Sequence, residues 1–264
     1  MAFLRVDFYS EALGSGTGMN VLLPEAAQGI GFDASAGTGA LPVLYLLHGL
    51  SDDHTAWMRR TSLERYAASR RLAVVMPCGG RSFYTNEAHG GRYWDFISEE
   101  LPRAVQSFFP VSRRREDTFA AGLSMGGYGA LKLALRHPDR YAAAASFSGV
   151  VDVAQAASSP AFRGIFPDGL FDTVFGAPAQ VRGTENDLFA LLDAQPAVRP
   201  RLYVSCGTAD PFFPSHRRFV SAARATGWDL TDVQEPNAAH NWDFWDAQIR
   251  AALDWLFQPG AARA

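Results

Sequence analysis

Apolar and polar positions follow two different periods along the chain, and the change of period separates the expected elements. Near the N-terminus, runs rich in Val, Leu, Phe and Tyr at 5–10 and 19–24 flank the glycine-rich stretch GSGTG. Two such runs joined by a turn predict an antiparallel hairpin. From Val43 onward, short continuous apolar runs alternate with segments in which apolar residues recur at helical spacing.

This alternation predicts a doubly wound, mostly parallel α/β sheet of about eight strands that includes the N-terminal hairpin. Strands that are apolar on both faces are typical of the centre of such a sheet, because helices cover both of its faces. The expected strands after the hairpin lie at 43–49, 72–77, 118–124, 142–149, 201–207 and 230–236, and the expected helices at about 53–70, 97–109, 126–137, 215–226 and 241–257.

Two segments interrupt the pattern. The stretch 28–42 is rich in small residues and is expected to be an exposed loop. The stretch 152–200 is rich in Ala, Ser, Pro, Gly and Phe, and long segments of this kind in a compact domain are often functional. We expect 152–200 to form a cap above the carboxyl ends of the strands, within a single domain that spans 1–264. A surface insertion without function is the alternative.

Composition excludes several classes of protein. The chain has 264 residues, of which 48% are hydrophobic and 19% charged, as in ordinary globular proteins. Its formal net charge of −3 argues against a nucleic-acid partner, and the short basic cluster SRRRED at 112–117 is expected to be a solvated loop. No apolar run is long enough for a membrane span, and no signal segment is recognised. Two isolated cysteines, Cys78 and Cys206, indicate a reducing, cytoplasmic location without structural zinc.

The candidate nucleophile is Ser124, which stands in Gly122-Leu123-Ser124-Met125-Gly126, a G-x-S-x-G pattern. The pattern alone is weak evidence. Here, however, an apolar strand leads into the serine and a helix follows it, as in a sharp strand-to-helix turn that exposes a serine hydroxyl. A serine that only caps the helix is the alternative interpretation.

A serine hydroxyl needs a base to accept its proton, and in this architecture the order along the chain is serine, acid, histidine. That order excludes His48, His54, His89 and His137, and leaves His216 and His240. His240 lies in a polar loop between the last strand and the last helix and is preferred, whereas His216 is expected at the surface of a helix. The preferred acid is Asp210, just beyond the strand 201–207, with Asp229, Asp232 and Asp243 as alternatives.

The oxyanion formed by attack on a carbonyl needs two backbone N–H donors. The expected donors are Met125, which follows the nucleophile, and Leu50, in the loop after the strand that begins at Val43. His48 and His54 lie in that same loop, LHGLSDDHTAW. Because both precede the nucleophile, His48 is expected to brace the loop and His54 to lie near the start of the next helix.

Several motifs together resemble the esterase D-type branch of the α/β-hydrolases, which holds S-formylglutathione hydrolases and bacterial tributyrin and acetyl esterases. They are YLLHGLSDDHTAW, VVMP with GGRSFYTN, ISEELPRAVQSFFP, TFAAGLSMGGYGALKLALRHPDRYAAAASFSG, SCGTADPF and AAHNWDFW. The similarity runs from about residue 3 to residue 257. Leu123 precedes the nucleophile where the formylglutathione enzymes commonly carry His, so the chain is more similar to the short-chain esterases. Cys78 occupies a position where relatives more often carry Asp or Asn.

The resemblance implies an α/β-hydrolase fold and a serine carboxylesterase of short-chain acyl esters, with Ser124, Asp210 and His240 as catalytic residues. The resemblance also implies that the protein needs no metal and no cofactor and that it can form a homo-oligomer, either a dimer or a tetramer. A formylglutathione-type thioesterase, an acetyl or feruloyl carbohydrate esterase, and a non-catalytic binding protein of this fold are the alternatives. Aromatic residues expected to line the substrate pocket are Trp57, Trp94, Phe175, Phe212 and Phe213.

Overall fold

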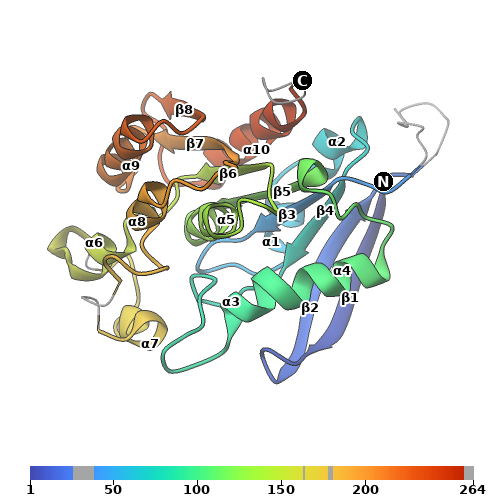
Figure 1. Cartoon of the computed structure of the whole chain (residues 1–264), viewed down its shortest axis with the longest axis horizontal. Coiled ribbons are helices and arrows are strands. Elements are labelled where there is room, and N and C mark those ends of the chain that lie inside the picture. Colours follow the sequence, from blue (N-terminus) through green and yellow to red (C-terminus); the bar gives the residue numbers. More distant parts are fainter. Residues whose placement is uncertain (26–38, 163, 178–180, 259–264) are drawn as a thin grey trace.

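A computed structural model describes residues 1–25, 39–162, 164–177 and 181–258 and contains one sheet with helices on both faces (Figure 1). Within these ranges the sheet has eight strands in the order β1-β2-β4-β3-β5-β6-β7-β8. β1 pairs with β2, and β2 with β4, in antiparallel fashion, and every later pairing is parallel. The expected mostly parallel sheet with an N-terminal hairpin is therefore confirmed.

The strands are β1 Ala2–Ser10, β2 Ser15–Leu23, β3 Val43–Leu47, β4 Ala73–Pro77, β5 Thr118–Leu123, β6 Ala143–Phe147, β7 Arg201–Gly207 and β8 Leu230–Glu235. The α-helices are α1 Ala56–Arg60, α2 Leu63–Ala68, α3 Tyr93–Asp95, α4 Leu101–Phe108, α5 Met125–Arg136, α6 Val153–Ser158, α7 Leu170–Phe175, α8 Leu188–Asp193, α9 Phe213–Ala225 and α10 Trp242–Phe257. Most of the expected loop 28–42 lies outside the described residues.

Two expected helices differ from the prediction. The segment 53–70 divides into α1 and α2 because Thr61 adopts an extended backbone between them. Its hydroxyl donates to the Trp57 carbonyl and accepts from the Leu63 N–H, so it ends one helix and caps the next. The helix expected at 97–109 begins earlier, at Tyr93, and passes through a π-helical stretch, Phe96–Glu100, before α4.

The core has two layers because successive side chains of each buried strand point to opposite faces of the sheet. Tyr45 and Leu47 of β3 pack in the layer that contains α4, α5 and α9, whereas Leu44 and Leu46 pack in the layer that contains α2 and α10. No helix in the described ranges is long and apolar enough to cross a membrane.

The described residues of the segment 152–200 include three short α-helices, α6, α7 and α8 (Figure 1). Phenylalanine rings join it to the main body of the protein. Phe166 lies 4.8 Å from Phe171 and 5.9 Å from Phe212 between ring centroids, and Phe171 lies 5.5 Å from Phe83. Aromatic contacts of this kind stabilise packing beyond the area they bury.

The turn between β5 and α5 places Ser124 in a backbone conformation that side chains rarely adopt, with φ 52° and ψ −116°. Neighbouring glycines make this turn possible. A Cβ on Gly122 would lie 2.4 Å from the Gly126 carbonyl oxygen, and one on Gly126 would lie 2.4 Å from the Leu47 carbonyl oxygen. The strand and the helix therefore approach more closely than any larger residue allows.

We expect Ser124→Gly to unfold at higher urea concentration than Ser124→Ala. Glycine adopts the native backbone angles without strain, whereas alanine keeps the strain, so the difference in free energy of unfolding should be about 1 kcal/mol in favour of glycine. Both variants lack the hydroxyl, which makes them a matched pair for equilibrium urea denaturation. Equal stability, or a more stable alanine variant, would show that the turn is not strained.

Candidate active site

Ser124, His240 and Asp210 form a continuous hydrogen-bonded chain although they are far apart in the sequence. The distance from His240 Nε2 to Ser124 Oγ is 3.1 Å, and that from His240 Nδ1 to Asp210 Oδ2 is 2.8 Å. The loops that carry them follow β5, β7 and β8, and parallel strands deliver such loops to one edge of a sheet. The three residues selected by their order in the sequence therefore meet in the structure.

Backbone and ring contacts hold the acid and the histidine in place. The Asp210 side chain is fully buried, and its Oδ1 accepts the Phe212 N–H at 2.8 Å, which leaves Oδ2 for the imidazole. The His240 ring lies between two aromatic side chains, with centroids 5.2 Å from Phe212 and 4.8 Å from Trp245. Only a quarter of the His240 side chain is exposed, so its orientation is restricted on both sides.

The loop after β3 lies directly against the Ser124 turn. A Cβ on Gly49 would lie 2.6 Å from Leu123 Cδ1 and 3.8 Å from Ser124 Cβ, so a larger residue would force the Leu123 side chain to move. The N–H groups of Leu50 and Met125 donate no hydrogen bond to any other described residue. The Met125 N–H is also the first of α5, where the helix dipole favours negative charge.

His48 anchors this loop through both ring nitrogens. Nδ1 lies 2.7 Å from the Gly49 carbonyl oxygen, and Nε2 accepts the Gly79 N–H at 2.9 Å. Because a backbone N–H can only donate, Nε2 must be unprotonated, so the proton of the neutral ring resides on Nδ1 and is donated to the Gly49 carbonyl oxygen. Burial lowers the pKa of His48 to about 4, so the ring stays neutral at physiological pH.

The bond to Gly49 has a consequence for Leu50, because the two groups share one peptide unit. In a planar trans peptide the carbonyl oxygen and the following N–H point in opposite directions. His48, together with the Asp52 N–H at 3.2 Å, fixes the Gly49 oxygen and thereby the direction of the Leu50 N–H. The expectation that His48 braces the loop thus gains a specific geometry.

A second buried loop supports the first. The Tyr84 hydroxyl donates to the His48 carbonyl oxygen at 3.0 Å, and Phe83 and Tyr84 both have φ of 50°. Behind them Lys132 of α5, fully buried, donates to Thr85 Oγ1 at 2.8 Å and lies 4.5 Å from the centre of the Trp94 ring. Burial lowers the Lys132 pKa well below its usual value.

Ser124 and His240 open into a cavity of about 740 Å³. Cap residues, among them Ile165 and Phe166, form part of its wall, which agrees with a cap above the strands. Three charged side chains also line it, Asp52, Arg60 and Arg81, and partial burial raises the pKa of Asp52. Its full lining is Gly49, Leu50, Ser51, Asp52, Arg60, Arg81, Leu123, Ser124, Gly164, Ile165, Phe166, Pro167, Phe212, His240, Asn241, Trp242 and Trp245.

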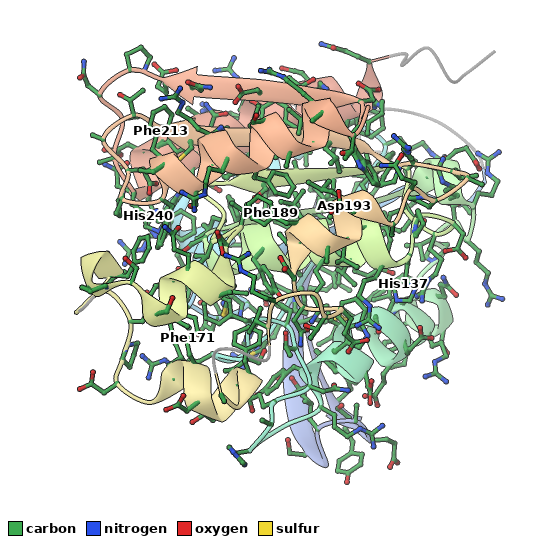
Figure 2. All side chains as sticks on the ribbon, turned by 60° about the vertical axis from the view of Figure 1, so that its left-hand side comes forward. His137, Phe171, Phe189, Asp193, Phe213 and His240 are labelled. Atoms are coloured by element: carbon green, nitrogen blue, oxygen red, sulfur yellow. The ribbon has the colours of Figure 1, made fainter. Side chains whose placement is uncertain are left out.

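Of the five aromatic residues expected in the pocket, Phe212 lines the cavity and the other four do not. Trp57 is buried in the core, where its Nε1–H donates to the Leu47 carbonyl. Trp94 stacks on His137, Phe175 packs in the aromatic cluster around Phe83, and Phe213 begins α9. Figure 2 shows His137 well away from His240.

Sequence reasoning missed Arg60, Arg81, Phe166, Trp242 and Trp245 as cavity residues. The two tryptophans belong to the motif AAHNWDFW, so their proximity to His240 could have indicated them. Phe166, Arg60 and Arg81 reach the cavity because of the course of the loops that carry them, and the periodicity of the sequence does not reveal that course.

The alternative histidine and acid pair with each other. His216, expected at the surface, is buried, and its Nε2 lies 2.8 Å from Asp232 Oδ1, because α9 packs beside β8. Asp243 lies in the first turn of α10 and does not line the cavity. His54 precedes α1 as expected and lines a different cavity together with Cys78. No cluster of three metal-ligating side chains occurs among the residues with described positions.

Comparisons with known proteins identify relatives over almost the whole chain. The family model Esterase, described as "Putative esterase", matches residues 10–256. An acetyl esterase of Caldicellulosiruptor saccharolyticus is 29% identical over 262 residues, which cover 97% of this chain and 98% of that protein.

Two solved structures from Staphylococcus aureus are similar over almost their whole length. A fluorophosphonate-binding serine hydrolase is 33% identical, with a TM-score of 0.85 and coverage of 98% of this chain and 99% of that chain. An S-formylglutathione hydrolase is 33% identical, with a TM-score of 0.81 and coverage of 97% and 98%. The resemblance to the esterase D-type branch is thereby confirmed. The chain belongs to the esterase family that this model describes, and it is a serine hydrolase of the α/β-hydrolase fold.

Proposed function

We propose that the protein hydrolyses short-chain acyl esters through an acyl-enzyme on Ser124. The observation that carries the proposal is the chain of contacts from Ser124 Oγ to His240 and Asp210, at 3.1 and 2.8 Å. A nucleophile, a base and a group that orients the base within hydrogen-bond reach are what acyl transfer requires. The similarity to an acetyl esterase supports a small acyl group.

In the first half-reaction Ser124 Oγ attacks the ester carbonyl while His240 Nε2 accepts its proton. Asp210 holds the imidazole by its Nδ1–H and stabilises the imidazolium without being protonated. The developing oxyanion lies against the Leu50 and Met125 N–H groups, which have no other partner in the described structure. His240 then protonates the leaving alcohol as the C–O bond breaks. Water, deprotonated by His240, releases the acid and restores Ser124.

A thioesterase of the S-formylglutathione type is a second candidate, and one feature of the cavity favours it. Arg60 and Arg81 line the cavity and form no ion pair with any described residue. Exposed cations at the mouth of a site attract anionic substrates, and a glutathione leaving group carries carboxylates. The 33% identity to an S-formylglutathione hydrolase is consistent with this candidate.

We place this activity in the cytoplasm, in one domain that spans the chain, with a small ester as partner and neither nucleic acid nor membrane. Cys78 and Cys206 are both free thiols, which supports a reducing compartment. Neither a metal nor a cofactor takes part in the proposed steps.

Replacing Ser124 by Ala should lower kcat for p-nitrophenyl acetate by at least about a thousandfold, because the nucleophile is lost. The same variant should no longer react with a fluorophosphonate probe, whereas His54→Ala should keep most of its activity and labelling. Labelling is read on a denaturing gel and turnover from release of p-nitrophenol. Undiminished labelling of the Ser124→Ala protein would assign the nucleophile to another residue.

The ester and thioester alternatives differ in their rates. We expect kcat/KM for p-nitrophenyl acetate and butyrate to exceed that for S-formylglutathione, each measured with the same purified protein. A preference of more than about tenfold for the thioester would replace the esterase proposal by the thioesterase one. In that case Arg81→Gln should lower kcat/KM for the thioester more than for the neutral esters.

The His48 geometry predicts opposite outcomes for two substitutions. In His48→Asn the side-chain amide can still donate to the Gly49 oxygen from the Nδ1 position, whereas in His48→Gln the side chain reaches only the Gly79 N–H. We expect His48→Gln to lower kcat by roughly ten- to a hundredfold, with KM changed little. A misdirected Leu50 N–H weakens stabilisation of the transition state and leaves binding of the substrate unchanged. His48→Asn should retain more of the wild-type kcat.

Tyr84→Phe is the matched control, because it removes a hydrogen bond to the same loop but to the neighbouring peptide. If His48 only stabilises the fold, all three variants should lose activity in proportion to their urea midpoints. Equal kcat values for the Asn and Gln variants would contradict the proposed role of the ring.

A further inference from the structure

The first strand leaves one edge of the sheet open. β1 runs for nine residues and pairs with β2 from Ala2 to Ser10 in a continuous register without a bulge. It is the terminal strand of the sheet, and within the described ranges no strand lies on its outer side (Figure 1). Long, regular edges present unpaired N–H and C=O groups to any second strand.

The side chains of β1 divide into two sets by face. The solvent face carries Phe3, Arg5, Asp7 and Tyr9, and each of these is exposed by between 51% and 67%. The opposite face carries Leu4, Val6 and Phe8, which pack against the core but remain partly accessible. Phe8 also contacts Phe96 and Phe108, with ring centroids 6.3 and 6.1 Å apart.

The order of these residues is self-complementary about Val6. We propose that two copies of the chain pair through β1, antiparallel and related by a twofold axis at Val6, so that their sheets become one continuous sheet. On the solvent face Arg5 then lies opposite Asp7 of the second copy, and Phe3 opposite Tyr9. On the other face Val6 lies opposite Val6, and Leu4 opposite Phe8. Directly opposed residues are the pairs that stabilise a sheet.

Neighbouring symmetric registers lack this complementarity. A twofold axis at Arg5 places two arginines opposite each other, and one at Asp7 places two aspartates opposite each other, and like charges at such positions are destabilising. Within one chain Arg5 Nε and Asp7 Oδ2 are 3.4 Å apart and exposed. In the dimer the two pairs become one cluster of four alternating charges. Arg5 and Asp7 therefore favour pairing with β1 of a second copy of this chain over pairing with an unrelated edge strand.

The dimer is closed, because the twofold axis uses the same edge of both copies. Asp210 and His240 follow β7 and β8, at the opposite end of the sheet order from β1. Each copy therefore retains its own site, and the inference does not depend on the proposed function.

Charge reversal provides the test. Arg5→Asp gives a strand with two acids at 5 and 7, and Asp7→Arg gives one with two arginines, so each variant should repel itself. Sedimentation velocity over a concentration series should show a dimer for the wild type and a dimer dissociation constant at least about tenfold weaker for each variant. An equimolar mixture of the two variants should form a heterodimer, because every charge then lies opposite its counterpart. The double variant Arg5→Asp/Asp7→Arg should dimerise by itself.

Arg217→Asp on α9 is the control for net charge, since Arg217 is exposed and far from β1 in the fold. It should leave the dimer unchanged. Circular dichroism and urea denaturation confirm that each variant is folded. The proposal is overturned if the wild type is monomeric up to about 1 mM, if the single variants dimerise as the wild type does, or if mixing them restores nothing.

Discussion

The turn at Ser124 is the constraint on which the rest of the site depends. Its φ of 52° is unfavourable for serine, and it is compatible with the tight packing around it because Gly122 and Gly126 have no Cβ that would clash with neighbouring backbone oxygens. The turn directs Ser124 toward His240 and starts α5 with a free N–H at Met125. Local strain at a position fixed by the surrounding structure is characteristic of functional sites. The position of the proposed nucleophile, the proposed first oxyanion donor and the β5–α5 packing thus arise from one feature.

Polar groups that are removed from solvent fix the direction of the Leu50 N–H, the proposed second oxyanion donor. His48 is neutral because it is buried, and neutrality is what lets one ring nitrogen donate to Gly49 while the other accepts from Gly79. Tyr84 and Lys132 extend this buried network from the loop to α5. Such networks rigidify a structure when every member is satisfied. The loop after β3 is therefore held by His48, Tyr84 and Lys132, none of which lines the cavity.

Sequence predicted the sheet, its hairpin and the order of its elements, because apolar periodicity reports which faces are buried. The order of Ser124, Asp210 and His240 along the chain also selected three side chains that the structure brings together. Residues of the pocket were harder to predict from the sequence. Trp57 and Phe175 are aromatic, as pocket residues often are, but both are buried in the core. His216 shows the same limit: its burial depends on Asp232 of β8, which no local pattern relates to it.

The sheet separates the candidate active site from the edge proposed for self-association. Its carboxyl edge carries the site and its cavity, and β1 at one end carries the self-complementary sequence. The most direct test of the central claim is peptide mass mapping after rapid acid quench of the protein during turnover of p-nitrophenyl acetate. We predict one added acetyl group on the peptide that contains Ser124, formed and lost at rates compatible with kcat. Turnover without that adduct, or with the acetyl group on another side chain, would contradict the account.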